Sequence, residues 1–432
     1  MINNVNSIKT KIEIGSTLYS IVIYLGGGII GKIIPFLLLP VLTRYLDPED
    51  FGLYATYQSV FVLITAFVGI NLNGAIIRGY TKLEINEFPI YLYSCMVLLF
   101  FSFIFVVFVL SVFGTYISKL TKIPYPWLML IPVIAAGAFL YKNILSIFRV
   151  EEKPITFSIW NVLYSLLNLI LAVVLVVVFH FDWRGMVISI AFANLTLGTA
   201  GLFLLLKKKL IKIKASKSYL MDAILFGSPL IIHHLSTWAG SMLNRPLLSQ
   251  FAGLEATGLF YTAFTIASVI TVFDAAVEQA WTPWLYRKLN NKKIEEKIQV
   301  VKVTYLYIVF LLILVLILSS ATKFILPWAL GDRFSGAADY VFLVALARAF
   351  TAMKRSVFGY ALFENKSYLI GYITFITTII GVLLNFLLIK NFGLMGAAYA
   401  MVGSNFLSFV LTWLVANHAS PMPWLLINTR HS

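Results

Sequence analysis

The chain has 432 residues, of which 60% are hydrophobic and only 12% are charged, and its formal net charge is +15. Soluble domains carry about 25% charged residues, so this composition excludes an ordinary soluble fold. The mean hydropathy of +0.90 is typical of a membrane protein, in which each helical span needs roughly 20 apolar residues.

The first apolar segment, Leu18–Leu42, contains a glycine-rich stretch that resembles two nucleotide-binding loops. Gly26–Lys32 reads GGGIIGK, which has both the GxGxxG spacing and that of a P-loop. A P-loop, however, follows a strand and has Ser or Thr after its lysine to hold magnesium. Here Ile33 follows, and the whole motif lies inside an apolar span. We therefore predict a bent, glycine-rich membrane helix with a lysine at membrane depth, and no nucleotide site.

Twelve long apolar segments follow one another along the chain. They are too long and too uniformly apolar to be spanning strands, so the sequence predicts an all-α polytopic membrane protein. The expected limits are Leu18–Leu42, Gly52–Ile77, Ile90–Phe113, Trp127–Phe148, Ile155–Phe179, Met186–Leu206, Leu220–Leu248, Thr257–Trp281, Val303–Leu326, Tyr340–Phe363, Tyr368–Ile389 and Leu394–Ala416. The single cysteine, Cys95, excludes an intrachain disulfide.

The basic residues predict the orientation of these spans. With both termini in the cytoplasm, the inside segments hold 22 Lys and Arg, Lys354 and Arg355 among them, and the outside segments hold seven. The positive-inside rule favours this arrangement. The positive charge is therefore mostly topological, and we do not expect a nucleic-acid partner.

An internal repeat divides the chain into two six-helix halves. When Phe51–Phe67 is shifted by 206 residues it lies over Thr257–Phe273, and 12 of 44 pairs are identical over positions 40 to 83. We predict an N-terminal lobe (1–206), a basic cytoplasmic linker (207–219) and a C-terminal lobe (220–432). Because six spans are an even number, both halves have one orientation. This parallel-repeat plan suggests a transporter with a central site that opens alternately to each side.

Several stretches resemble a known family. They are Pro40-x-x-x-Arg44-Tyr45-Leu46 followed by DPEDFGLY, the long segment Leu225–Phe260, EEK at Glu151–Lys153, and FGLMGAAYA at Phe392–Ala400. Together they look like Wzx-type O-antigen and polysaccharide flippases of the multidrug/oligosaccharidyl-lipid/polysaccharide (MOP) exporter superfamily. One departure is Asn244-Arg245, where members often have Asp-Arg, which puts a role for an acidic group there in doubt.

The resemblance implies transport of an undecaprenyl-pyrophosphate-linked oligosaccharide, an O-antigen or capsule repeat unit, from the cytoplasmic to the periplasmic leaflet of the bacterial inner membrane. Membrane lipid is the second expected partner. A polysaccharide polymerase and a chain-length regulator are the further partners of such a pathway. Neither a cofactor nor a metal is expected.

Four cations within the spans are the candidate substrate-binding residues. Ionisable groups at membrane depth usually face a cavity or the interior of the bundle. A cationic cavity suits a pyrophosphate group, which Arg binds bidentately. The candidates are Lys32, Lys142, Arg245 and Arg348. For Lys142 and Arg245, snorkelling to the interface is the alternative.

Two acids deep in one span are candidates for coupling transport to H⁺ or Na⁺. Asp274 and Glu278 are four residues apart and therefore share one helix face. The alternative is that they pair with the cations and have a structural role. The adjacent His233 and His234 point to different faces and make a poor metal pair.

Two other functions remain open from sequence alone. One is an integral-membrane polymerase or ligase, but the loops are too short for a catalytic domain and no nucleophile with a base is apparent, so we do not expect an enzyme. The other is an exporter of drugs or small cations with the same fold, for which a cationic lining would be repulsive.

Overall fold

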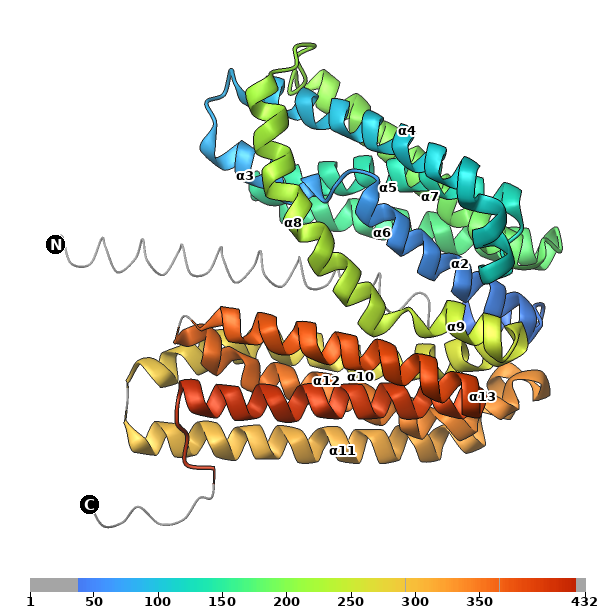
Figure 1. Ribbon diagram of the computed structural model, residues 1–432, viewed down its shortest axis with the longest axis vertical. Helices are drawn as coiled ribbons and strands as arrows, with labels where there is room; N and C mark the ends of the chain where they lie inside the picture. The colour runs from blue at the N-terminus through green and yellow to red at the C-terminus, as the bar shows by residue number, and fades with distance from the viewer. Residues whose placement is uncertain (1–37, 292, 365, 425–432) are drawn as a thin grey trace. The chain divides into compact units, whose positions relative to one another are not determined.

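The computed structural model describes residues 38–291, 293–364 and 366–424. All regular structure in these ranges is helical, which confirms the all-α class (Figure 1). The first expected span, Leu18–Leu42, lies largely outside the described residues, as do its glycine-rich motif and Lys32. The elements are α2 (Pro48–Phe67), α3 (Leu72–Lys82), α4 (Phe88–Thr121), α5 (Tyr125–Val150), α6 (Pro154–Val173), η1 (Val174–Val178), α7 (Asp182–Lys207), α8 (Lys217–Ser241), α9 (Asn244–Phe251), α10 (Leu254–Asn290), α11 (Ile294–Leu330), η2 (Asp332–Ala337), α12 (Ala338–Phe363) and α13 (Ser367–Ala419).

Helix length and apolarity agree with a polytopic membrane protein. Eight described helices are long and apolar enough to cross a membrane, or nine if the bent pair α2 and α3 counts as one span. The 53-residue α13 is two arms joined at Gly393, whose φ of 55° and ψ of −130° are not helical. A Cβ on Gly396 would lie 1.9 Å from the carbonyl oxygen of Leu388, so the chain folds back tightly at this point. The two arms correspond to the last two expected spans.

The chain forms two compact units. Unit 1 comprises Met1–Leu46 and Thr56–Trp238, and unit 2 comprises Asp47–Ala55 and Ala239–Ser432. Most of α8, which follows the basic linker, therefore packs within unit 1. The linker is held on α4 as well, because the backbone N–H of Ser216 donates to Ser94 Oγ at 3.2 Å. The lobe limits expected from the repeat, 1–206 and 220–432, remain a prediction.

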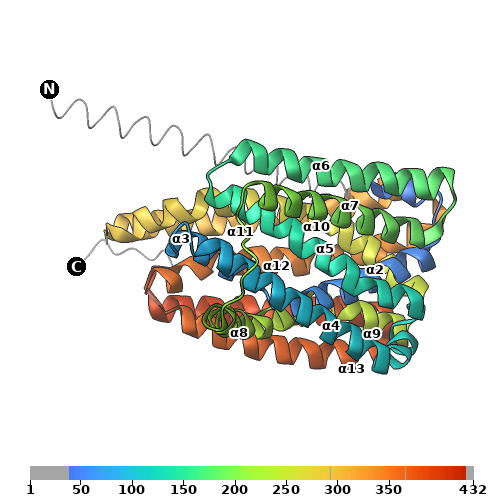
Figure 2. The same ribbon diagram turned by 90° about the horizontal axis from the view of Figure 1, so that it is seen from above.

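Small residues bring the helices of unit 1 close together. In Figure 2, α5, α6 and α7 lie side by side. A Cβ on Gly198 of α7 would lie only 2.5 Å from the carbonyl oxygen of Gly137 in α5. Such small-residue contacts are typical of membrane helices, which associate by close backbone packing.

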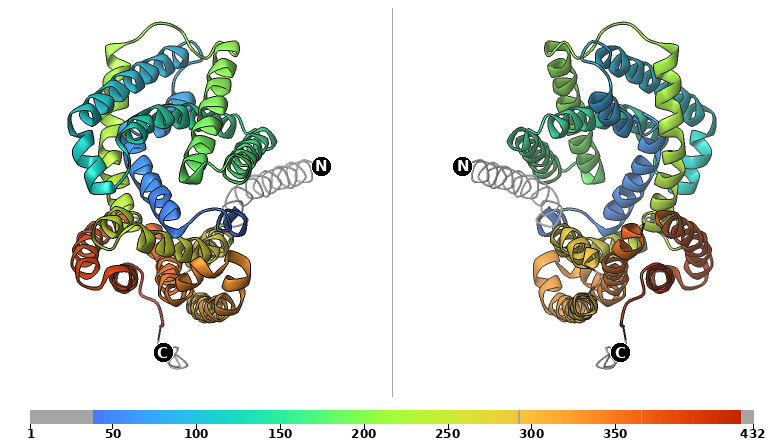
Figure 3. Two further views of the ribbon diagram at one scale, coloured as in Figure 1. Left: turned by 90° about the vertical axis from the view of Figure 1, so that its right-hand side faces the viewer. Right: turned by 90° about the vertical axis from the view of Figure 1, so that its left-hand side faces the viewer.

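Unit 2 is a bundle of α10 to α13 (Figures 1 and 3). α12 is its central element, since it contacts α10, α11 and both η2 and α13. The first residues of α2 also belong to this unit. Phe51 packs edge-on against Phe334 with ring centroids 5.2 Å apart, and Arg333 forms an ion pair with Asp47.

Candidate functional site: a broken helix, buried cations and an acid pair

A break between α2 and α3 forms one wall of a cavity in unit 1. Gly69, Ile70 and Asn71 have φ values of 94°, 46° and 52°, so three successive residues leave the helical conformation and the two helices meet at 42°. Gly69 is required here, because its φ is left-handed and a Cβ would lie 2.5 Å from the Phe139 ring. The N–H of Gly69 donates to Ser102 Oγ at 3.0 Å. The break is thus built into the packing of α4 and α5.

Helix α8 is fixed across this break within unit 1. Near its start, Asp222 forms an ion pair with Arg78 and accepts a hydrogen bond of 3.0 Å from Tyr91 Oη. Near its end, Trp238 Nε1 donates to the carbonyl oxygen of Ser59 at 2.8 Å. Between them, a Cβ on Gly227 would lie 2.3 Å from the carbonyl oxygen of Ile70. These contacts place His234 over the break.

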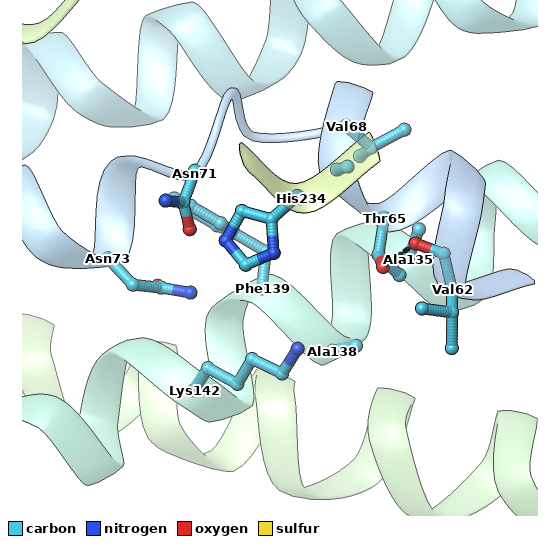
Figure 4. A pocket seen from close by; sticks show the side chains of 11 residues that line it. Val62, Thr65, Val68, Asn71, Asn73, Ala135, Ala138, Phe139, Lys142 and His234 are labelled. Atoms are coloured by element: carbon cyan, nitrogen blue, oxygen red, sulfur yellow. Dashed lines mark hydrogen bonds between the residues drawn. The ribbon is translucent and has the colours of Figure 1, made fainter. Parts of the chain in front are cut away.

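The resulting cavity has a volume of about 130 Å³. A volume of about 15 Å³ is enough for one water molecule, so the space admits a much larger group. Figure 4 shows the side chains of Asn73, His234 and Lys142 pointing into it from α3, α8 and α5. Lys142 forms no ion pair with a carboxylate in the part of the chain that the structure describes.

Two arginines of unit 2, the buried Arg245 and the half-buried Arg348, share one aromatic ring. The guanidinium Cζ atoms of Arg245 and Arg348 lie 4.9 and 3.9 Å from the centroid of Phe264. Arg245 is only 2% exposed. Nε and Nη1 of Arg245 and Nε of Arg348 have no hydrogen-bond partner among the described residues.

Aromatic contact is a weak substitute for a counter-ion. A desolvated cation–π contact contributes about 2 kcal/mol, whereas a buried ion loses several kcal/mol of hydration. Neither arginine has an ion pair within residues 38–291, 293–364 and 366–424. The pair can therefore bind an anion, because unpaired guanidinium N–H groups are strong donors to phosphate or carboxylate.

The two acids of α10 are joined by a cation of α12. Arg355 Nη1 lies 2.8 Å from Asp274 Oδ2 and 3.3 Å from Glu278 Oε2. Tyr307 of α11 donates from Oη to Asp274 Oδ1 at 2.9 Å. Asp274 is 4% exposed, so its charge is compensated inside the bundle. The space lined by this network is only about 10 Å³.

The structure thus brings the predicted residues together in two sets, and Lys32 lies outside the described part. Arg245 and Arg348 share the Phe264 ring, and Asp274 and Glu278 share Arg355. Lys142 lines a separate cavity of unit 1. Three participants were missed by sequence reasoning: Arg355, which was counted with the cytoplasmic cations, Tyr307 and Phe264. The spacing of Arg348 and Arg355, two helical turns apart, is the signal that could have placed them on one face.

The chain is similar to known proteins in both sequence and structure. A protein of the Lsg locus of Haemophilus influenzae (strain ATCC 51907 / DSM 11121 / KW20 / Rd) is 25% identical over 374 residues, which cover 83% of this chain and 88% of that protein. The structure of the lipid II flippase MurJ in an inward closed conformation is similar, with a TM-score of 0.75 and 10% identity over 92% of this chain and 87% of MurJ. An inward-facing multidrug-resistance MATE transporter of the MOP superfamily has a TM-score of 0.67 and 16% identity over 90% and 94% of the two chains.

The two solved structures show a shared fold, and the family follows from the sequence itself. Residues 18–289, well over half of the chain, match the family described as polysaccharide biosynthesis protein. The resemblance to a polysaccharide-export family seen in the sequence is thereby confirmed. The chain belongs to the polysaccharide biosynthesis protein family and has the fold of the MOP superfamily of transporters.

Proposed function

We propose that this protein is a flippase that moves an undecaprenyl-pyrophosphate-linked oligosaccharide from the cytoplasmic to the periplasmic leaflet of the bacterial inner membrane. Support comes from membership of the polysaccharide biosynthesis family and from the fold shared with the lipid II flippase MurJ. Transport proceeds by alternating access, as the parallel internal repeat favours. Both termini are cytoplasmic, and the transported unit is an O-antigen or capsule repeat.

The observation that carries the proposal is the pair of arginines, Arg245 and Arg348, around Phe264. Nε and Nη1 of Arg245 and Nε of Arg348 are buried without a hydrogen-bond partner, and neither guanidinium has a protein counter-ion among the described residues. A diphosphate supplies the missing negative charge and can accept parallel hydrogen bonds from each guanidinium. An anionic lipid head group is therefore the substrate class that suits these residues.

An exporter that has the same fold but transports organic cations is disfavoured, because both acids of α10 are already paired with an arginine. Asp274 and Glu278 are both engaged by Arg355, so neither offers a free carboxylate to a cationic drug. A membrane-embedded polymerase or ligase is disfavoured by the connections. Residues 208–216 form the longest non-helical connection between described helices, and this is too short for a catalytic domain.

Deletion of the gene tests the proposal. The deletion strain is expected to lack the surface polysaccharide and to accumulate its complete undecaprenyl-linked unit in the cytoplasmic leaflet, with both effects reversed by the wild-type gene. Mass spectrometry of extracted lipids identifies the unit. A strain that accumulates polymerised glycan in the periplasm would point to a ligase, and a strain with normal polysaccharide but greater drug sensitivity would point to a drug exporter.

A further inference from the structure

The internal repeat places Lys142 and Arg355 at the same position. Helices α5 and α12 both have 26 residues, and each is followed at the same distance by Glu-x-Lys, at Glu151–Lys153 and Glu364–Lys366. The shift of 213 residues that superposes these features carries Lys142 onto Arg355. The two cations therefore occupy one repeat position in the two units.

The acids beside Arg355 have no counterpart beside Lys142. The shift of 206 residues that aligns α2 with α10 carries Asp274 onto Val68 and Glu278 onto Leu72. In unit 2 the carboxylates neutralise the cation and leave about 10 Å³ of space. In unit 1 the equivalent positions are apolar, and the cation faces about 130 Å³. The equivalent position in unit 1 thus has a cation, Lys142, and a cavity beside it, but no carboxylate among the described residues to pair with that cation.

The walls of the unit 1 cavity offer further donors to an anion. The N-terminus of α3 opens beside it, and its N-cap residue Asn71 makes no side-chain capping hydrogen bond. A helix N-terminus favours negative charge through its unpaired amides. Asn73 lines the cavity from α3, and its side-chain N–H groups can donate to an oxyanion. His234 supplies a third polar side chain (Figure 4).

We infer that this cavity is a binding site for a phosphate-type oxyanion, in which the diphosphate of the transported lipid takes the place that Asp274 and Glu278 occupy in unit 2. Lys142 provides the charge, and Asn73 with the N-terminus of α3 provides directed hydrogen bonds. The identity of the ligand rests on the proposed function. The presence of the oxyanion site rests on the cavity and its unpaired cation.

Binding of inorganic pyrophosphate to the full-length protein in lipid nanodiscs, measured by calorimetry, tests the site. Because Arg245 and Arg348 offer a second locus, all variants are compared in an Arg348→Ala background. Lys142→Ala is expected to weaken pyrophosphate binding by about tenfold to a hundredfold, as for loss of a hydrogen bond to a charged group. Lys142→Arg should retain it. Lys119→Ala, which removes an exposed lysine in the last turn of α4, is the matched control and should bind as the parent does.

A second variant, in which an acid of unit 2 is introduced at the equivalent repeat position of unit 1, keeps the test decisive if Lys142→Ala folds poorly. Val68→Asp places a carboxylate at the position of Asp274, so it should neutralise Lys142, preserve monodispersity in size-exclusion chromatography and abolish pyrophosphate binding. Equal affinities in the parent, Lys142→Ala and Val68→Asp would overturn the site. Glucuronate competing as well as pyrophosphate would overturn its phosphate preference.

Export assays in cells separate this inference from the proposed function. Lys142→Ala should abolish surface polysaccharide and trap the lipid-linked unit. Pyrophosphate binding that depends on Lys142, together with wild-type export by Lys142→Ala, would overturn the assignment of the site to the transported lipid. A deletion strain that traps no lipid-linked unit would instead overturn the proposed function, whatever the calorimetry shows.

Discussion

Gly52 and Gly258 occupy the same position in the two repeats and make the same contact. A Cβ on Gly52 of α2 would lie 1.9 Å from the carbonyl oxygen of Leu254, and a Cβ on Gly258 of α10 would lie 1.8 Å from that of Pro48. The four residues form two pairs related by the 206-residue shift of the repeat. The contact is therefore reciprocal, and within unit 2 the two helices cross with their backbones touching, which only glycine allows.

The first prediction concerns this crossing. Gly258→Ala should lower the free energy of unfolding by at least about 1–3 kcal/mol, because the added methyl group meets a rigid backbone carbonyl and forces the helices apart. Thermal unfolding followed by size-exclusion chromatography measures the loss. Gly371→Ala is the control, since a Cβ there has no atom within 4 Å. Equal melting temperatures for both variants would contradict the crossing.

Most of the fold could be predicted from the sequence because membrane insertion makes strong demands on composition. Each span needs a long apolar run, so the helices are visible without knowledge of their packing. The breaks within individual spans were harder to predict. The expected span Gly52–Ile77 is bent at Gly69–Asn71, and Leu220–Leu248 is divided into α8 and α9. Such breaks depend on contacts such as Gly69 with Phe139, which join residues far apart in the chain.

The candidate site was predictable only in part. The cost of a charge at membrane depth singled out Arg245, Arg348 and Asp274 as unusual. Which cation meets which acid depends on the rotation of each helix and on the packing of its neighbours. Arg355 was for this reason assigned to the cytoplasmic edge, although it lies within α12 and pairs with Asp274. The Phe264 ring has no sequence signature that separates it from other apolar residues.

The second prediction concerns the arginine pair around Phe264. Arg245→Ala and Arg348→Ala should each abolish or strongly reduce surface polysaccharide while the protein stays inserted and abundant. Arg348→Lys should also fail where the guanidinium binds phosphate through two N–H groups, which lysine cannot do. Immunoblots of membranes report abundance, and glycan gels report export.

The control for the arginine pair is neutralisation of the linker lysine Lys209, which lies outside the helices and should leave export at the wild-type level. Lys32→Ala is expected to behave like the arginine variants, with Lys32→Arg better tolerated. Wild-type export by both Lys32→Ala and Arg348→Ala would show that substrate binding in a cationic cavity is the wrong mechanism for this protein.

The third prediction concerns topology. Both termini should be cytoplasmic, because 22 basic residues lie in the expected inside segments and seven in the outside segments. A periplasm-specific phosphatase reporter should be inactive after Ser432 and active when inserted within residues 119–126. The reverse pattern of reporter activity would contradict the predicted orientation.

The fourth prediction concerns Glu151, which lies between α5 and α6. Burial raises the pKa of its carboxyl group, but hydrogen bonds and charges from Lys153 and Lys208 outweigh this, so the net pKa is below its ordinary value of 4.5. A depressed pKa stabilises the folded state above pH 4.5, and this contribution is lost as the pH falls through the folded pKa. Glu151→Gln should therefore cost about 1 kcal/mol at neutral pH, and less in acid.

Glu152→Gln provides the matched control for Glu151, because it removes the same charge from an exposed neighbour. Melting temperatures of both variants and the wild type between pH 7 and pH 4 give the comparison. A deficit of Glu151→Gln that is independent of pH, or that appears equally in Glu152→Gln, would speak against the network with Lys208.

The fifth prediction concerns the acid pair and ion coupling. If transport is driven by H⁺ or Na⁺, Asp274 is the carrier best placed, because it is buried and a bound cation would compete with Arg355 for it. Asp274→Asn and Glu278→Gln should then abolish the dependence of transport on imposed pH or sodium gradients in proteoliposomes. A structural role predicts instead that gradient dependence survives and that only stability changes.

A double substitution distinguishes coupling from stability. Arg355→Ala alone leaves Asp274 buried without its cation, which should cost about 3–5 kcal/mol and reduce abundance. Arg355→Ala combined with Asp274→Asn removes both charges and should restore abundance. If the double variant is as abundant as the wild type and transports without regard to either gradient, the pair couples transport to an ion. If it is abundant and still follows a gradient, Asp274 and Arg355 only hold α10 against α12, and the coupling ion binds elsewhere.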